Sequence, residues 1–363
     1  MTVSAFVYAE QWPFQRTGWL RNATAITYSM EVMEPGKFQF ELPANNALSI
    51  TAGALVGFKS SYGLPDFLGW VDRVEESYGG AFVTVSGREW SAILNERTTV
   101  QDRTYVAGVA GIIAADIVRS ASARNPTGIM VMPSGGSTPI TSPFSLRADA
   151  VLSALNDLAQ LTGDEYEIVY QAGVSATASF FWRGKIGFDM RDTLHLAGKM
   201  IAGADYALDA INDRALVQVV GSSGDFGSRP SAAAIDTGPL ALQDTSLIRT
   251  SLPADASKRQ VQRRGIATSR EAVIRDTSLP DGLSVQRGAV ETLRALIAGQ
   301  ETISVLVSPY ADWSLLSPGN LITVRLPNLR FGEHVVRAFR ILGIQPREER
   351  GVMELVGKVV ANA

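Results

Sequence analysis

Several residue types are missing or rare in this chain of 363 residues, and each absence excludes a class of site. There is no cysteine, so disulfides, thiolate metal sites and cysteine nucleophiles are excluded. His195 and His334 are the only histidines, so one chain cannot build a multi-histidine zinc or iron site. We predict that His195 is a half-buried polar residue, assign His334 no role, and expect no metal or cofactor.

Excess charge of one sign and long apolar runs are also missing. Lys and Arg number 33 and Asp and Glu 36, a net charge of -3, so the basic footprint of a dedicated nucleic-acid binder is absent. The first residues lack the basic and apolar regions of a signal peptide. The most apolar window, Val106–Val118, contains Asp116 and is too short to span a bilayer. We therefore expect a protein made in the cytoplasm, with no membrane insertion by this chain.

Strand patterns fill the first hundred residues. Phe38, Phe40 and Leu42 alternate with polar residues, which is typical of a half-buried strand. Further strands are expected at 55–59, 67–77 and 81–89, separated by turns, with a short helix at 88–95. Short strands at this spacing predict a small β-barrel or sandwich.

The middle of the chain has a different pattern. Residues 107–122 are rich in alanine and isoleucine and predict a helix. Residues 147–163 have apolar residues at helical spacing and end on a glycine, which predicts a second helix. Strand patterns at 164–171, 176–184 and 185–191 predict an antiparallel meander.

A pattern near the N-terminus returns near the C-terminus. "TAGALVGFK" at 51–59 and "SPGNLITVR" at 317–325 place a glycine, an apolar pair, another apolar residue and a base in the same order. Each is followed by a second strand, a glycine turn, and a third strand that ends in glycine and a base. Alternation and glycine turns occur in any meander, so the shared order of three strands is what favours an internal duplication.

The predicted fold is mainly β: two related β-barrels and an inserted α/β domain. We expect a first barrel at 1–100, completed by 206–222, an insert at 101–205, and a second barrel at 223–363 that includes a linking helix at 288–299. Two related domains per chain, arranged with three-fold symmetry, would form a pseudo-six-fold ring, so we predict a homotrimer.

Basic residues align between the two predicted barrels. Lys59 matches Arg325, and Arg88 matches Lys358. In a trimer each pair would give a ring of six charges, which could contact acidic groups of an adjoining ring or line a bore and meet passing phosphates. Strand-end bases that simply reach water explain the same pattern.

Four N-terminal segments resemble baseplate or tail hub proteins of tailed bacteriophages: "EVMEPGKFQFELP", "AGALVGF", "FLGWVDRVE" and "VTVSGREWSAILNERTT". "DYALDAINDRALVQVVGS" is similar to the strand by which such proteins re-enter the first barrel. The resemblance is clearest over 30–100. The residues that carry it are Gly69, Val71, Asp72, Val74, Ser86, Gly87, Arg88, Glu89, Leu94 and Arg97.

The resemblance implies a structural, non-enzymatic hub with two tail-tube-like barrels per subunit. Such a hub assembles in the host cytoplasm and lies at the tail tip or baseplate of the virion. The implied partners are a distal tail or tail tube ring protein, tip or receptor-binding proteins, the tape-measure protein, and DNA that passes during ejection. Many relatives carry a cell-wall hydrolase or peptidase domain after the hub region; this sequence ends soon after the last predicted strand, so we expect no lytic activity in it.

Enzyme functions stay open as alternatives. A glycan hydrolase needs two facing carboxylates, and the candidates are Asp189 with Asp192 or Glu165 with Glu167. A solvated strand face explains the second pair as well, because residues i and i+2 share a face. "VVGSSGDFG" lacks the spacing of an esterase nucleophile elbow, and the glycine runs lack the lysine of a phosphate loop.

A carbohydrate-binding or cell-wall-active role is the other alternative. Trp12, Phe14 and Trp19 are candidates for a sugar-stacking platform. Core packing or a subunit contact explains the same three aromatics, because aromatic residues dominate both.

Overall fold

The structure is a computed structural model, and it divides into two compact units: Met1–Ala204 with Ser304–Gly357, and Asp205–Ile303 with Lys358–Ala363. The residues that it describes are 3–9, 13–45, 50–76, 80–99, 103–133, 135, 137–140, 143–146, 148–209, 216–220, 231–235, 271–275, 285, 289, 300–327, 334–347 and 351–360.

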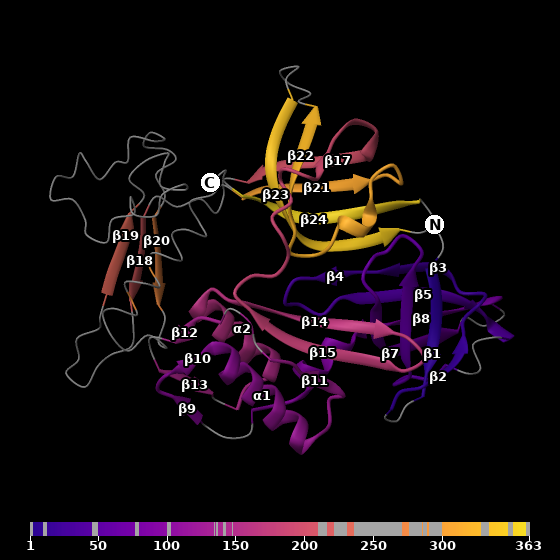
Figure 1. The fold of residues 1–363 in the computed structure, drawn as a ribbon, viewed down its shortest axis with the longest axis horizontal. Helices are drawn as coiled ribbons and strands as arrows, with labels where there is room; N and C mark the ends of the chain where they lie inside the picture. Colours follow the sequence, from indigo (N-terminus) through magenta and orange to yellow (C-terminus); the bar gives the residue numbers. More distant parts are fainter. Residues whose placement is uncertain are drawn as a thin grey trace. The chain divides into compact units, whose positions relative to one another are not determined.

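The N-terminal part of the first unit is an antiparallel sheet, which confirms the predicted β character (Figure 1). Phe38, Phe40 and Leu42 are buried while their neighbours are more exposed, as the alternation predicts. The strand order is β3-β5-β8-β7-β6-β1-β2, and a 3-10 helix, Trp90–Glu96, follows β8. The strands are β1 (Val3–Tyr8), β2 (Arg16–Trp19), β3 (Thr24–Tyr28), β4 (Met30–Glu31), β5 (Lys37–Pro43), β6 (Leu55–Ser60), β7 (Phe67–Glu76) and β8 (Phe82–Glu89).

The inserted region contains both predicted helices, α1 (Ala110–Arg124) and α2 (Val151–Thr162). Gly163 ends α2 with a φ of 73°, a left-handed conformation that glycine adopts without strain. The helices pack in one core with a sheet of order β11-β15-β14. The strands of this region are β9 (Arg103–Tyr105), β10 (Gly108–Val109), β11 (Ile129–Val131), β12 (Pro139–Ile140), β13 (Phe144–Leu146), β14 (Glu165–Ala172), β15 (Ala176–Arg183) and β16 (His195–Leu196).

The prediction of a third meander strand at 185–191 is wrong. β14 and β15 do form the predicted antiparallel hairpin, but β11 takes the third place and runs parallel to β15. Residues 188–190 run instead along the end of another strand, where the N–H of Leu321 donates to Phe188 O at 2.9 Å. The apolar alternation of this segment was recognised, but its partner lies more than a hundred residues away.

The C-terminal strands repeat the order of the N-terminal ones. The order β17-β21-β24-β23-β22-β16 matches β3-β5-β8-β7-β6-β1 position by position, although β16 runs parallel to its neighbour and β1 antiparallel. We call the two sets the first and second β modules. The new strands are β17 (Ile201–Asp209), β21 (Gln300–Val307), β22 (Leu321–Pro327), β23 (His334–Arg347) and β24 (Val352–Val360).

The turns that open β6 and β22 have the same geometry. Gly53 and Gly319 have φ values of 90° and 92°, the positive φ that the third residue of a type II turn requires. Each turn makes the same pair of backbone bonds. These are Gly53 N–H to Val71 O and Gly319 N–H to Ile341 O, both 2.7 Å, with Ala54 N–H to Thr51 O at 3.1 Å and Asn320 N–H to Ser317 O at 3.2 Å.

Glycines also match in the third strand of each module. Trp70 and Arg340 are equivalent, because they pair with Leu55 and Leu321, the first residues of the equivalent strands β6 and β22. A Cβ on Gly87 would collide with the backbone oxygen of Trp70, and one on Gly357 with that of Arg340, in each case beside an aromatic ring. The repeat in the sequence is therefore a repeat in backbone geometry.

This equivalence predicts that Gly87→Ala and Gly357→Ala destabilise the protein alike, by about 1–3 kcal/mol each, since both overpack a strand pair. Gly18→Ala is the control, because a Cβ there meets nothing within 4 Å. Urea unfolding of the three variants measures the effect. A loss in one module alone would show that the two glycines are not equivalent.

The two modules are not separate sheets. β23 pairs with β3 at Arg347 and Thr27 and with β4 at Ile344 and Met30, which joins both modules into one sheet. Strand alternation identifies each module but carries no signal for pairing between modules, so the sequence did not indicate that the two related barrels share a sheet.

The predicted completion of the first barrel by 206–222 disagrees with the pairing of its described strand. β18 (Leu216–Val220) pairs with β19 (Ser231–Ile235) and β20 (Glu271–Arg275) in a three-stranded sheet of the second unit. An apolar run of five residues does not specify which sheet it joins. The domain boundaries themselves stay a prediction. The linking helix at 288–299 lies outside the described residues except for Ala289, which is helical.

Candidate functional site

The four aligned basic residues differ in their surroundings. Lys59 and Arg325 are exposed at equivalent places in β6 and β22, and Lys358 is exposed in β24. Arg88 is held by two carboxylates. Its Nε and Nη2 donate to Asp72 at 2.6 and 2.8 Å, and Nη2 also donates to Glu96 at 2.8 Å.

The ion pairs of Arg88 change what this residue offers to a partner. The hydrogen bonds from Arg88 to Asp72 and Glu96 raise the pKa of the guanidinium, so it stays charged. Two carboxylates around one cation leave the cluster with a net negative charge. Lys59 and Arg325 are therefore better placed than Arg88 to meet an anionic partner.

Glu165, one of the four candidate catalytic carboxylates, is neutralised by two bases. Glu165 accepts hydrogen bonds from Arg340 Nη1 and Nη2 at 2.8 and 2.6 Å, from Lys185 Nζ at 3.2 Å and from the N–H of Ile186 at 2.8 Å. Burial alone would raise the pKa of Glu165, but the bonds from Arg340 and Ile186 outweigh it, and the pKa lies below its ordinary value. A carboxylate fixed in this way is a structural ion pair.

The other three candidate carboxylates contact bases or solvent. Glu167 pairs with Arg183. Asp189 pairs with Arg191, whose hydrogen bonds lower the pKa of Asp189. Asp192 is exposed. The structure thus places a base against three of the four carboxylates, which does not favour a glycosidase pair.

His195 is exposed, so its predicted half-buried position is wrong. It opens the two-residue strand β16, where its neighbour Leu196 takes the buried position. His334 opens β23, and its side chain lies outside the described residues. In the described part of the chain no group of three potential ligands could hold a metal ion, and no helix is both long and apolar enough to cross a membrane.

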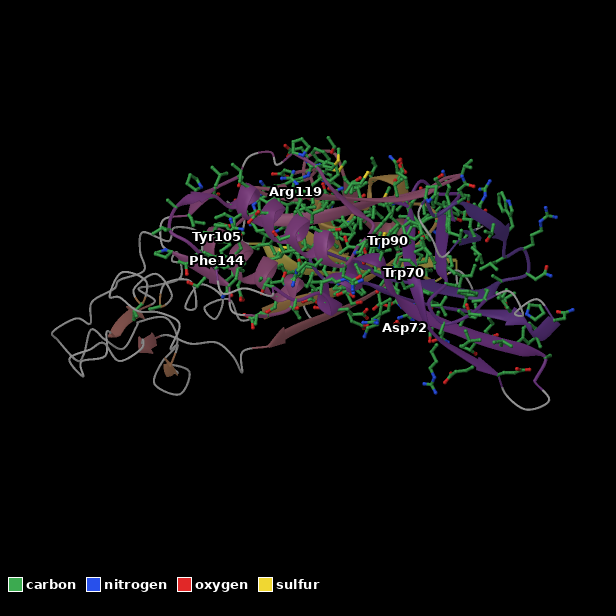
Figure 2. The ribbon with its side chains drawn as sticks, turned by 90° about the horizontal axis from the view of Figure 1, so that it is seen from below. Trp70, Asp72, Trp90, Tyr105, Arg119 and Phe144 are labelled. Atoms are coloured by element: carbon green, nitrogen blue, oxygen red, sulfur yellow. The ribbon has the colours of Figure 1, made fainter. Side chains whose placement is uncertain are left out.

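The three N-terminal aromatics do not form a described platform. Trp12 lies outside the described residues. Phe14 is buried and packs edge-on against Trp90 and Trp70, with ring centroids 5.0 and 5.8 Å away. Figure 2 shows Trp70 and Trp90 close together. Of the two described aromatics, Trp19 is the one that could face a partner, because it is 52% exposed.

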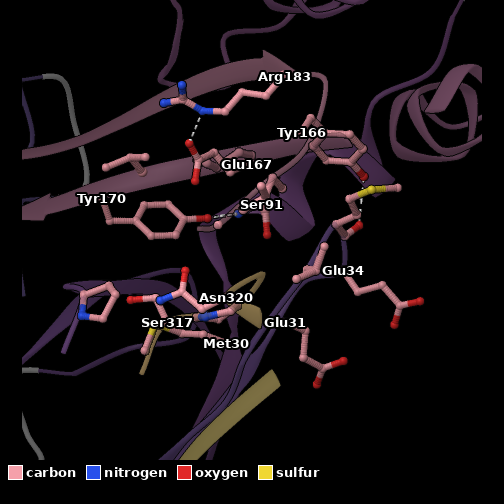
Figure 3. A pocket seen from close by; sticks show the side chains of 18 of the residues that line it. Met30, Glu31, Glu34, Ser91, Tyr166, Glu167, Tyr170, Arg183, Ser317 and Asn320 are labelled. Atoms are coloured by element: carbon pink, nitrogen blue, oxygen red, sulfur yellow. Dashed lines mark hydrogen bonds and ion pairs between the residues drawn. The ribbon is translucent and has the colours of Figure 1, made fainter. Parts of the chain in front are cut away.

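A groove of about 680 Å³ lies within the first unit. One wall is residues 166–170 of β14, and the other includes 30–35, which contain β4 and the turn after it. Figure 3 shows Tyr166 and Tyr170 on one side and Glu31 and Glu34 on the other. Its remaining lining residues are Pro65, Asp66, Glu89, Ser91, Leu152, Arg183, Lys185, Ile186, Gly187, Phe188, Met190, Ser314, Leu315, Ser317, Pro318 and Asn320.

A buried carboxylate lies in the wall of this groove. Glu89 accepts a hydrogen bond from the N–H of Gly36 at 2.6 Å and is bonded to the Tyr170 hydroxyl. That hydroxyl also accepts the N–H of Ser91 at 3.2 Å. Burial raises the pKa of Glu89 to about 7, even though both bonds favour its charged form.

Sequence reasoning missed Arg340 and the burial of Glu89. Arg340 lies in an alternating strand and has no motif around it, so nothing local points to a partner 175 positions away. Glu89 was noted as part of "V-S-G-R-E", but its burial depends on the packing of the insert against β8. The groove itself is built from segments distant in sequence, and no single segment carries its signal.

The comparisons with known proteins agree on the fold. No protein-family model and no curated protein sequence matches the chain. The 43 kDa tail protein of prophage MuSo2 from Shewanella oneidensis matches with a TM-score of 0.61 at 14% identity, over 98% of both chains. The tail protein from Neisseria meningitidis MC58 has a TM-score of 0.60 at 12% identity, over 99% of this chain and 97% of its own.

A third solved structure, prophage tail protein gp18 from Listeria monocytogenes EGD-e, has a TM-score of 0.56 at 8% identity, over 99% of this chain and 94% of its own. This chain therefore has the fold of phage tail proteins. The resemblance found in residues 30–100 and the predicted mainly β fold are both confirmed at that level.

Proposed function

We propose that this protein is a structural hub of a phage tail, without enzymatic activity. The observation that carries the proposal is the repeat of strand order and turn geometry in the two β modules. Three copies with two related modules each would present six similar units around one axis. Such a ring would connect a six-fold tail tube to a three-fold tip and continue its channel for DNA.

The proposed partners follow from this arrangement. One face would contact the distal tail or tail tube ring protein, and the other would contact tip or receptor-binding proteins. The tape-measure protein would fill the bore before DNA passes during ejection. The protein would act in the virion, at the tail tip or baseplate, after assembly in the host cytoplasm.

Basic residues at matching places in both modules fit this proposal. Lys59 and Arg325 are exposed, and in a trimer they would alternate around one ring of six charges. Arg88 and Lys358 would form a second ring, weakened at every Arg88 by Asp72 and Glu96. Such rings would meet acidic groups of the adjoining protein or the phosphates of DNA.

Native mass spectrometry tests the proposal first: we expect a species with three times the mass of one chain. Electron microscopy of that species, viewed along its axis, should show a central channel surrounded by six similar lobes. A monomer that binds cell-wall glycan would instead support the carbohydrate-binding alternative. Clearing of cell-wall material that is lost in Asp189→Asn would overturn the non-enzymatic assignment.

A further inference from the structure

Strand β14 lies at an edge of its sheet, and this edge faces the groove. Among the described strands, the sheet order β11-β15-β14 leaves β14 with one neighbour. Five consecutive β14 residues, 166–170, line the groove. Neighbouring side chains of a strand point to opposite faces, so a continuous run of lining residues means that the backbone edge itself borders the cavity.

The register shows which backbone groups of β14 face outward. Residues opposite each other in an antiparallel pair alternate between exchanging two hydrogen bonds and exchanging none. The carbonyl of Phe180 in β15 points away from β14 and accepts a hydrogen bond from the N–H of Met132 at 3.0 Å. Its partner in β14, Ile168, is therefore at a non-bonded position, with its N–H and C=O directed away from β15.

Because the strand has a period of two residues, the backbone N–H and C=O groups of Tyr166 and Tyr170 also point away from β15. Ala172, at the next such position, confirms the assignment, because its N–H turns away from β15 and donates to Asp66 Oδ2 at 2.8 Å. Within the described residues, no backbone hydrogen bond is recorded for the outward groups of Tyr166, Ile168 or Tyr170. Tyr166 and Tyr170 are buried and Ile168 is half-buried, so a further strand could reach these unpaired groups only from within the groove that they line.

The charge of the groove selects its occupant. Glu31 and Glu34 line the wall opposite β14 and form no ion pair with any described residue (Figure 3). Burial, and then the neighbouring Glu34, raise the pKa of Glu31 and outweigh the lowering effects of the Ser29 hydrogen bond and of Lys37; a cation close to Glu31 would oppose this rise. The bases on the β14 side, Arg183 and Lys185, are already paired with carboxylates of β14. The uncompensated charge is negative.

The apolar part of the groove is adaptable. Met30, Met33 and Met190 line it, and flexible thioether side chains fit surfaces of varied shape. Phe188 is 78% exposed and Leu315 is 37% exposed, so apolar area remains to be covered. An occupant therefore needs apolar side chains as well as a positive charge.

We propose that this groove binds an extended segment of a partner protein, which adds to β14 as a further strand. Its backbone pairs with Tyr166, Ile168 and Tyr170, its apolar side chains cover the methionines, and a Lys or Arg lies against Glu31 and Glu34. This site belongs to a single subunit and does not depend on the proposed ring.

Fluorescence anisotropy with labelled peptides tests the site on the full chain. The probes are peptides of about eight residues, the length of a short strand, in which apolar residues alternate with lysine, glutamate or glutamine. We expect the lysine set to bind at least about tenfold more tightly than the glutamate set. Methylation of alternate peptide nitrogens should abolish binding. Equal binding of all three sets, or no binding by the lysine set, overturns the proposal.

The protein variants separate strand pairing from shape. Ile168→Pro removes an outward N–H but no bond to β15, which proline tolerates at a sheet edge. Ile168→Pro should lower the affinity for the lysine peptides at least about tenfold. The matched control Ile168→Ala keeps the N–H and should lower this affinity less. Glu31→Gln with Glu34→Gln should reduce the preference for lysine. Unchanged circular dichroism shows that each variant is folded.

Two results with Ile168→Pro would contradict the proposal. Full peptide affinity in a folded Ile168→Pro protein would show that the edge of β14 does not pair. If Ile168→Pro instead dissociates a self-associated form of the protein, the occupant is a second copy of this chain and not a partner segment.

Discussion

Replacement of Arg340 by alanine should lower the free energy of unfolding by about 3–5 kcal/mol, the cost of leaving a buried charge without its partner. The side chains of Glu165 and Arg340 are 9% and 15% exposed, so water replaces the lost bonds poorly. Lys185 stays near Glu165, but its side chain is 64% exposed and holds one oxygen at 3.2 Å. Urea unfolding followed by tryptophan fluorescence measures the loss.

Two controls define the cause of this loss. Arg191→Ala removes an arginine from the exposed pair with Asp189 and should change stability little. Replacing Glu165 and Arg340 together by leucine should recover most of the stability, because the uncompensated charge is gone. If Arg340→Ala is no less stable than Arg191→Ala, the pair does not hold the insert to the second module.

The pH dependence supplies an independent readout. The pKa of Glu165 is lowered in the folded protein, so its stabilising effect is present above the unfolded pKa and is lost as the pH falls through the folded pKa. The difference between the natural chain and Arg340→Ala should therefore be largest near neutral pH and shrink on acidification. A difference that does not vary with pH would point to lost packing of the arginine stem.

The equivalence of Trp70 and Arg340 explains the position of the ion pair between Arg340 and Glu165. Both modules turn the same strand position toward the inserted region: Trp70 packs against its core beside Trp90, and Arg340 binds Glu165. The contact at this equivalent position is thus apolar in the first module and ionic in the second. The glycine-led turns that fix the register could be predicted from the sequence. The contacts that Trp70 and Arg340 make at this register position could not.

The sequence predicts local elements here better than their partners. Alternation located β5, β6, β8 and β22, and the Leu-rich pattern with Gly163 located α2, because these signals depend on neighbours in the chain. Pairing of β23 with β3 and of β18 with β20 joins segments far apart in sequence, and no residue type encodes such a choice. The groove is lined by segments as distant in sequence as 30–35, 166–170 and 314–320, so it could only be seen in the folded chain.

The burial of Glu89 predicts a second large effect on stability, with a pH dependence opposite to that of Glu165. Its pKa is raised from 4.5 to about 7, first because burial disfavours the carboxylate and then by the charge of Glu31. Between these two values the folded protein binds more protons than the unfolded chain, so stability should fall as the pH rises. The loss amounts to about 3 kcal/mol in total and levels off above the folded pKa.

Glu89→Gln should remove this decline and leave the variant more stable than the natural chain above about pH 8. The amide can accept the N–H of Gly36 through its oxygen and donate to the Tyr170 hydroxyl through its nitrogen, so both bonds survive without a buried charge. Glu76→Gln, at the exposed end of β7, is the matched control and should leave the pH profile unchanged. Unfolding free energies measured across this pH range decide the matter: a decline that persists in Glu89→Gln would mean that another group titrates, and the wall of the groove would then carry its negative charge throughout.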